Sequence, residues 1–263
     1  MLILLPPSEG KAAPRRGTSL QPEQLSFPEL RAPRSEVLAA LVGLCASDDP
    51  AALEKASGVL GVGKTLGAEV ARNAGLATAP AARADRIYTG VLYEALDLAS
   101  LEGPARRRAT ARVATVSALF GLVRPHDHIP AYRLSGDVSL PGIGNMATFW
   151  GRHLDTAIAA AGGRGLVVDL RSSTYTPFWR PDPETARQVV TVRVLHEVDG
   201  RRKVVSHFNK ATKGRIVRAM LLDGGTPRTP EEFADHLRDL GWTVEPGRTG
   251  KHGTGVDVVV SDL

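Results

Sequence analysis

Met1-Leu2-Ile3-Leu4-Leu5-Pro6-Pro7-Ser8-Glu9-Gly10-Lys11 opens the chain and decides its fold class. The uninterrupted apolar run of residues 2–5 is typical of a buried strand. Two prolines end it, because proline fixes its own φ and restricts the residue before it. The residues that follow are small, polar and basic. The stretch therefore predicts a core strand whose carboxyl end presents Ser8 and Lys11 on a loop.

Three further segments repeat this pattern of an apolar run that leads into polar and basic residues. The strand predicted at 165–170 leads into Arg171-Ser172-Ser173-Thr174-Tyr175, and the one predicted at 203–207 leads into Phe208-Asn209-Lys210-Ala211-Thr212-Lys213-Gly214-Arg215. The third segment, 117–136, holds its charged residues between Pro125 and Pro130, which stiffen the loop. We expect four loops that direct cations and hydroxyls from strand ends.

In open α/β sheets, ligands bind outside the carboxyl ends of the strands, so these loops predict one basic crevice. Clustered cations favour an anionic ligand such as phosphate. The predicted phosphate- or DNA-binding residues are Lys11, Arg124, Arg133, Arg171, Lys210, Lys213, Arg215 and Lys64. The predicted pocket or catalytic residues are Ser8, Tyr88, Asp169, Ser172, Ser173, Tyr175 and Asn209.

Asp169 has two interpretations, because it closes an apolar run two residues before Arg171. It could orient that arginine or a nearby lysine, or it could be a general base with a pKa tuned by burial and by those cations. Both interpretations stay open at this point.

The predicted elements indicate a single α/β (α+β) domain over residues 1–263, with a mixed sheet surrounded by helices. Predicted helices include 148–161 and 210–222, and predicted strands include 87–89 and 112–116. Asp199-Gly200 is the strongest hairpin signal. Strands and helices mix without a regular βαβ repeat, and no linker marks a boundary.

Composition narrows the function classes. The chain has 263 residues, with 33 Lys and Arg against 28 Asp and Glu, a net charge of +5. Its one cysteine, Cys45, can form no internal disulfide, and no metal site is expected, since His126, Asp127 and His128 are too close together to surround an ion. No signal peptide or membrane-length apolar run is present. We expect a cytoplasmic monomer without a cofactor or membrane partner.

Residues 58–65 match the phosphate-loop pattern G-x-x-x-x-G-K-[ST]. A phosphate loop needs a buried strand before it, whereas residues 50–57 have a helical pattern. The same residues fit a helix-hairpin-helix element at about 50–75, in which hairpin amides hold a DNA phosphate. A plain tight turn between packed helices explains the sequence equally well.

Several motifs together resemble the peroxide stress protein YaaA family. They are Met1 to Lys11, Tyr88-Thr89-Gly90, Ser117 to Leu134, Phe149-Trp150-Gly151, Leu170 to Tyr175 and Ser206 to Gly214. The resemblance implies a cytosolic α/β protein that limits oxidative damage, with a positively charged crevice, a helix-hairpin-helix and affinity for DNA. Better-known relatives open with Ser-Pro-Ala-Lys where this chain has Pro-Pro-Ser-Glu-Gly-Lys, and their hairpin has fewer glycines.

We therefore expect a protein of the response to hydrogen peroxide that binds DNA through its crevice, with weak sequence selectivity. The alternative is an enzyme that acts on a nucleotide or a nucleic-acid base held by the same cations. Small nucleotides should compete with DNA only in the second case. A peptide-binding module is disfavoured, because no exposed apolar stripe is visible.

Overall fold

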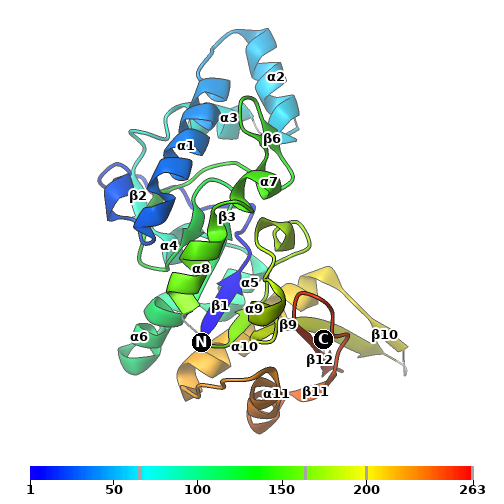
Figure 1. Ribbon diagram of the computed structural model, residues 1–263. Helices are drawn as coiled ribbons and strands as arrows, with labels where there is room; N and C mark the ends of the chain where they lie inside the picture. Colours follow the sequence, from blue (N-terminus) through cyan, green and yellow to red (C-terminus); the bar gives the residue numbers. More distant parts are fainter. Residues whose placement is uncertain (64–66, 163–164, 199–200, 262–263) are drawn as a thin grey trace.

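A mixed eight-stranded sheet forms the centre of the molecule (Figure 1). The computed structural model describes residues 1–63, 67–162, 165–198 and 201–261. In this part of the chain the strand order is β11-β12-β9-β8-β1-β3-β4, with β10 paired to β9. The strands are β1 (Leu2–Leu5), β3 (Val113–Ser117), β4 (Gly121–Val123), β8 (Val167–Asp169), β9 (Val189–Val198), β10 (Arg201–Lys203), β11 (Thr243–Pro246) and β12 (Thr254–Val260).

Strand β1 lies inside the sheet, between two parallel neighbours. Ile3 is in register with Val113 of β3 on one side and with Val168 of β8 on the other. All four residues of β1 are fully buried, which explains their uninterrupted apolar character. The pairs β8–β9 and β9–β12 are also parallel. The carboxyl ends of β1, β3 and β8 therefore meet at one edge of the sheet.

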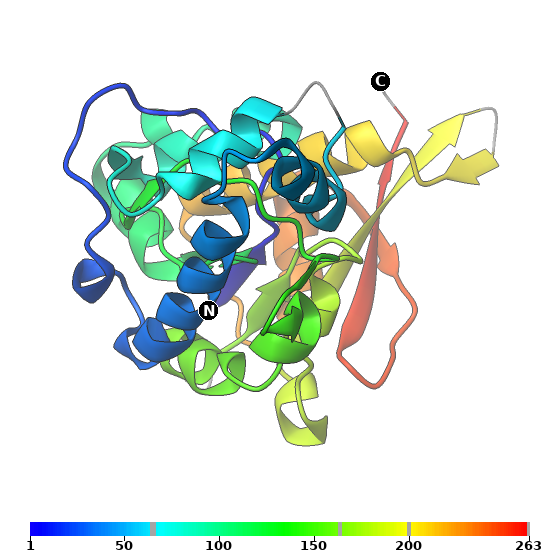
Figure 2. The same ribbon diagram turned by 90° about the horizontal axis from the view of Figure 1, so that it is seen from above.

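Helices cover the sheet and one end of the molecule. Figure 1 shows α1, α2 and α3 together at the top of the view, and Figure 2 shows β10 and the end of β9 extending away from the rest of the molecule. The helices are α1 (Arg31–Cys45), α2 (Pro50–Leu60), α3 (Gly67–Ala74), α4 (Ala84–Ile87), α5 (Val91–Leu96), α6 (Gly103–Arg112), α7 (Met146–Trp150), α8 (Leu154–Gly162), α9 (Pro183–Ala186), α10 (Ser206–Asp223) and α11 (Pro230–Asp239). Two small sheets lie outside the main one: β2 (Ala81–Arg83) pairs with β5 (His128–Pro130), and β6 (Ser139–Leu140) with β7 (Gly144–Asn145).

Helix α10 packs closely against α5, and Gly214 makes this approach possible. A Cβ at Gly214 would collide with the carbonyl oxygen of Leu92. Only glycine allows two backbones to come this near. The packing matters for the site described below, because both helices contribute residues to it. None of the described helices is long and apolar enough to cross a membrane.

The predicted fold class is confirmed, but several predicted elements were wrong. The helix predicted at 148–161 is two helices. The first, α7, begins early, where Asn145 caps it by accepting a hydrogen bond from Thr148 N at 3.1 Å, and it ends at Trp150, whose Nε1 donates to Ala118 O at 2.7 Å. Residues 84–87 form α4 instead of a strand at 87–89. Helix α10 begins at Ser206, so the strand predicted at 203–207 and the helix start at 210 were misplaced. The hairpin strands β9 and β10 do pair antiparallel, whereas the turn Asp199-Gly200 lies outside the described residues.

The glycine-rich segment after α2 is not delivered by a strand, as predicted. Gly58 is inside the helix, and the helix ends at Gly61, whose φ is 62°. The amides of Gly61 and Val62 donate to the carbonyls of Gly58 and Ser57 at 3.2 and 3.0 Å, a Schellman-type end. The segment therefore begins as a helix terminus, which the phosphate-loop pattern does not allow. Lys64 and Thr65 lie outside the described residues, so the helix-hairpin-helix element stays a prediction.

Candidate functional site

A cavity of about 540 Å³ lies where the loops after β1 and β8 meet the start of α5. We call it the site cavity. It is where the sequence pattern predicted ligand binding, at the carboxyl ends of parallel strands. Its lining residues are Pro6, Pro7, Ser8, Glu9, Gly10, Lys11, Thr89, Gly90, Val91, Leu92, Tyr93, Arg133, Leu134, Ser135, Ser172, Thr174, Tyr175 and Lys210.

The loop after β1 is held against the segment that precedes α5. Ser8 Oγ donates to the carbonyl of Gly10 at 2.5 Å and accepts the amide of Thr89 at 3.0 Å. Thr89 Oγ1 donates to the same carbonyl at 3.0 Å. Lys11 and Tyr88 form an isolated β-bridge. These contacts fix the backbone from which the Lys11 side chain enters the cavity wall.

Lys11 is a partly buried amine in an unusual environment. Its Nζ donates to the carbonyl of Ser8 at 2.7 Å and to that of Glu9 at 3.3 Å. It lies 4.2 Å from the ring centroid of Tyr132 and 5.8 Å from that of Tyr88. Burial, and next the positive charge of Arg133, lower the pKa of Lys11 to about 7. Burial therefore favours the neutral amine at this position.

The four tyrosines of the chain surround this lysine or the cavity beside it. The hydroxyl of Tyr132 is 3.1 Å from that of Tyr88 and 2.7 Å from Ser117 Oγ at the end of β3. The ring of Tyr93 stacks on that of Tyr88 at 5.3 Å, and its hydroxyl donates to the carbonyl of Pro6 at 2.7 Å. Burial raises the pKa of each of these phenols, and that of Tyr175, above its ordinary value. They remain protonated at neutral pH and offer hydrogen-bond donors.

Arg133 connects the site cavity to helix α3 through contacts with Glu69 and Asn73. Its guanidinium lies 3.8 Å from a carboxylate oxygen of Glu9 and 3.5 Å from one of Glu69. Its main chain is held by Asn73, which accepts the Arg133 amide at 2.9 Å and donates to the Arg133 carbonyl at 2.7 Å. Arg133 therefore faces the cavity from a fixed position with two acidic neighbours.

Asp169 and Arg171 form a buried pair below the site. Two guanidinium nitrogens of Arg171 donate to the two carboxylate oxygens at 2.8 and 2.7 Å, and the remaining donors reach the carbonyls of Tyr175 and Trp179 at 3.1 and 2.9 Å. Only 1% of the Arg171 side chain is exposed. Burial alone would raise the pKa of Asp169, but the charge and hydrogen bonds of Arg171, with Lys213 nearby, hold it below its ordinary value. Of the two interpretations of Asp169, this geometry favours orientation of Arg171.

Helix α10 places its cations in different surroundings. Lys210 is exposed and lines the cavity, and Arg215 is exposed outside the lining. Lys213 points inward, where its Nζ lies 3.4 Å from the carbonyl of Leu170 and burial lowers its pKa despite the attraction of Asp169. The oxygen of the Asn209 amide is buried without a hydrogen-bond partner.

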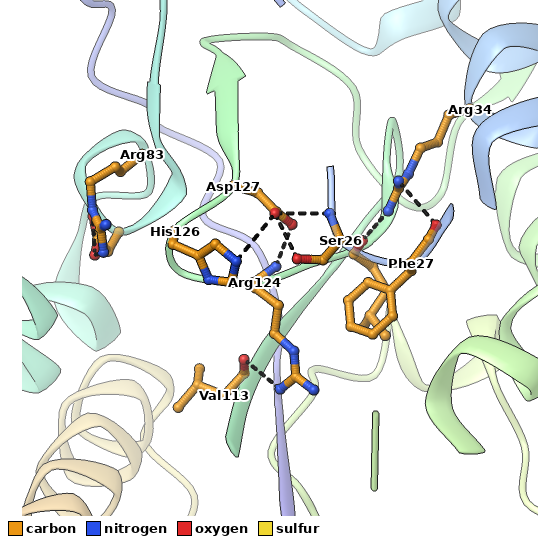
Figure 3. Close-up of polar contacts among 10 residues, drawn as sticks. Ser26, Phe27, Arg34, Arg83, Val113, Arg124, His126 and Asp127 are labelled. Carbon is orange, nitrogen blue, oxygen red and sulfur yellow. Dashed lines mark hydrogen bonds and ion pairs between the residues drawn. The ribbon is translucent and has the colours of Figure 1, made fainter. Parts of the chain in front are cut away.

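Arg124 lies away from the cavity, contrary to prediction. Its guanidinium donates to the carbonyls of Ala111 and Val113 at 2.8 and 3.2 Å, at the end of α6 and the amino end of β3 (Figure 3). Its amide donates at 2.8 Å to Asp127, which also accepts the amide and hydroxyl of Ser26. The proline-flanked turn is therefore built around a buried carboxylate and carries Arg124 toward the opposite edge of the sheet.

The predicted residues thus divide into two groups. The structure brings Ser8, Lys11, Arg133, Ser172, Tyr175 and Lys210 together around the cavity. It does not place Tyr88, Arg124, Asp169, Arg171, Ser173, Asn209, Lys213 or Arg215 in the lining. Arg124 and Arg171 are the clear corrections, because backbone carbonyls and Asp169 already occupy their donors. Lys64 lies outside the described residues.

Sequence reasoning missed five polar residues of the lining, Glu9, Thr89, Tyr93, Ser135 and Thr174, and two residues that contact its cations, Glu69 and Tyr132. Tyr132 stands directly before a predicted site residue, Arg133, and Thr89 directly after Tyr88, so adjacency was an available signal. Glu69 had none, because it comes from α3, which only the folded chain brings to the cavity. Among the described lining residues, three cations face one carboxylate, that of Glu9.

The fold and cavity define an α/β protein with a cation-lined site at the carboxyl edge of its sheet. A family model described as peroxide stress protein YaaA matches residues 1–247. A UPF0246 protein of Streptomyces coelicolor is 51% identical over 265 residues, covering all of both chains. A UPF0246 protein of Corynebacterium efficiens is 43% identical, covering 93% of this chain and 95% of its own, and one of Corynebacterium glutamicum is 40% identical with the same coverage. The chain belongs to the peroxide stress protein YaaA (UPF0246) family.

Proposed function

We propose that this protein acts in the response to hydrogen peroxide by binding DNA, with phosphates that contact the cations of the site cavity. Membership of a family described by peroxide stress supports the first part. The observation that carries the second is the convergence of Lys11, Arg133 and Lys210 around one cavity. Phosphate contacts position nucleic acid without reading its sequence, so the affinity should depend on salt and little on sequence.

The size of the cavity limits how DNA can bind. About 540 Å³ is typical of a small-molecule site and cannot hold a duplex. We propose that one nucleotide, unpaired or turned out of the stack, enters the cavity while flanking phosphates contact exposed Lys210. Tyr93 and Tyr175 line the cavity and offer partners for a base.

The test compares two charge reversals. Lys210→Glu should weaken the binding of a duplex with an unpaired nucleotide several-fold, and the slope of log affinity against log salt should fall by about 1. Lys251→Glu is the matched control, because Lys251 is also exposed but precedes β12, at the amino-end edge of the parallel strands. Fluorescence anisotropy of labelled oligonucleotides measures both. Equal affinities for the two variants would remove the cavity from the proposed DNA interface.

An enzyme that acts on a nucleotide or a nucleic-acid base remains the second candidate, favoured by the small-molecule size of the cavity. Asp169 is a poor base for it, because its carboxylate is held by Arg171. Free nucleotides that displace labelled DNA at similar concentrations would favour this candidate. Displacement only by oligonucleotides would favour DNA binding.

A further inference from the structure

Lys11 differs from Arg133, the other cation held in the wall of the site cavity, in lacking a carboxylate partner. Within the described part of the chain, no carboxylate lies within ion-pair distance of its Nζ, since the two nearby acids, Glu9 and Glu69, pair with Arg133. The amine instead faces two carbonyl oxygens and the rings of Tyr88 and Tyr132. This arrangement places a lysine in the wall of a ligand-sized cavity without the acid that normally keeps it charged.

We propose that Lys11 is a nucleophile that forms an imine with an aldehyde whose phosphate is held by Arg133 and Lys210. The inference rests on the proposed function, because it names the class of ligand that the same cavity takes. The aldehyde belongs to an abasic deoxyribose in DNA or to a free sugar phosphate. Both present the same aldehyde and phosphate to the cavity.

The surroundings of Lys11 give its amine the reactivity that this step needs. Lysines that form imines are activated by desolvation or by a neighbouring cation, and Lys11 has both. Burial, and then Arg133, lower its pKa to about 7, and Glu69 and Glu9 oppose this without reversing it. The phenols of Tyr88 and Tyr132 stay neutral, because burial raises their pKa values.

The reaction balances without a cofactor. The neutral Nζ attacks the aldehyde carbon, a C–N bond forms, and the carbonyl oxygen takes up the proton lost by nitrogen to give a carbinolamine. The carbinolamine then loses its hydroxyl together with the remaining N–H proton as water, and a C=N bond replaces the C–O bond. Tyr175, which lines the same cavity and stays protonated, offers a hydroxyl donor to the departing oxygen.

The anion is expected at the mouth of the cavity, beside the reacting amine. Lys210 is exposed at one turn of α10, and the Arg133 guanidinium is held on the other side by α3 and the loop after β1. Glu9, whose side chain is 83% exposed, can turn away when a phosphate arrives. A phosphate on the aldehyde should therefore increase capture.

Reductive trapping tests the proposal on the intact protein. Wild-type protein is mixed with an oligonucleotide that carries an abasic aldehyde, or with 2-deoxyribose 5-phosphate, in the presence of sodium cyanoborohydride. We expect a stable adduct that peptide mass mapping places on Lys11, with a yield that rises through pH 7. Absence of an adduct from both samples, or an adduct mainly on another lysine, would overturn the proposal.

Two variants sharpen the result. Lys11→Arg keeps the positive charge but removes the nucleophile, and we expect at least a tenfold loss of adduct. Lys210→Gln keeps Lys11 and should lower the yield several-fold for phosphorylated aldehydes only. A Lys11→Arg protein that is trapped as well as wild type contradicts the assignment, and mapping of the wild-type adduct does not depend on the folding of any variant.

The abasic oligonucleotide and the sugar phosphate distinguish the two sources of the aldehyde, and a binding measurement distinguishes the imine proposal from the DNA-binding proposal. Capture of the abasic oligonucleotide alone identifies DNA as the source, and capture of the sugar phosphate alone identifies a free metabolite. Anisotropy with an intact oligonucleotide is measured on the same preparation. Binding of DNA without capture of any aldehyde would contradict the imine proposal and leave the DNA-binding proposal standing. Capture of the sugar phosphate without DNA binding would support the imine proposal and contradict DNA binding.

Discussion

Two loops of this protein have similar residue types, but the folded chain places one at the site cavity and the other away from it. The loop after β1 and the turn at Arg124–Asp127 both combine proline with cations and follow apolar runs. In the first, Lys11 faces a cavity that it shares with Arg133 and Lys210. In the second, Arg124 donates to backbone carbonyls and Asp127 is enclosed by Ser26 and the Arg124 amide (Figure 3).

The difference lies in what surrounds each cation after folding. Arginine has five donors in a planar fork, so a buried arginine can satisfy several carbonyls at once. Arg34 binds carbonyls in the same way, because its guanidinium donates to the carbonyls of Phe120 and Leu122 at 2.9 and 2.6 Å. Lys11 also donates to two carbonyls, at 2.7 and 3.3 Å, but its residue lines the site cavity, where a ligand can reach it. Cations next to strand ends therefore act as structural groups or as ligand-binding groups according to whether folding places them at the cavity.

The largest expected effect concerns the buried pair, which belongs to the structural group. Asp169→Asn should lower the free energy of unfolding by about 3–5 kcal/mol, because it leaves the Arg171 guanidinium buried without its countercharge. The pKa of Asp169 lies below its ordinary value, so this contribution is present above about pH 4 and is lost as the pH falls further. Urea unfolding at several pH values measures it.

A double variant provides the control for this pair. Replacing both partners, Asp169→Leu with Arg171→Met, should destabilise the protein less than the sum of the single changes. Full additivity would mean that the two side chains act independently. A protein of wild-type stability with Asp169→Asn would return Asp169 to the candidates for a general base.

A smaller effect is expected at Arg124, and it tests the comparison directly. Arg124→Met should cost about 1–3 kcal/mol, because it leaves the carbonyls of Ala111 and Val113 without a donor. It should leave DNA affinity unchanged, in contrast with Lys210→Glu. Thermal unfolding and anisotropy on the same samples decide this. A several-fold loss of affinity in folded Arg124→Met protein would contradict the division into two groups.

The sequence predicted the site best where polar or basic residues directly follow a buried strand. The buried strand at Leu2–Leu5 and the cavity position of Lys11 follow from local pattern, since parallel core strands share a carboxyl edge. The pairing of Arg171 with Asp169 could be anticipated only as one of two interpretations. The position of Arg124 could not be predicted, because it depends on carbonyls of α6 and β3 that folding brings together. The same holds for the approach of Glu69 from α3.

The smallest effect per step of the experiment, about 1 kcal/mol for each pH unit, concerns the ligand-binding group, through the pH dependence of stability. The unfolded chain has Lys11 with a pKa of about 10.4, whereas in the folded protein the pKa is lowered to about 7. Between these values the unfolded state binds the proton and the folded state does not, so the contribution of Lys11 makes stability rise with pH.

Lys11→Met removes this contribution. The difference in unfolding free energy between wild type and variant should therefore grow in favour of wild type by about 1 kcal/mol per pH unit from pH 7 toward 10. Exposed Lys251→Met should leave the slope unchanged. Parallel curves for wild type and Lys11→Met would mean that Lys11 stays charged in the cavity, and would place it with the cations that only bind.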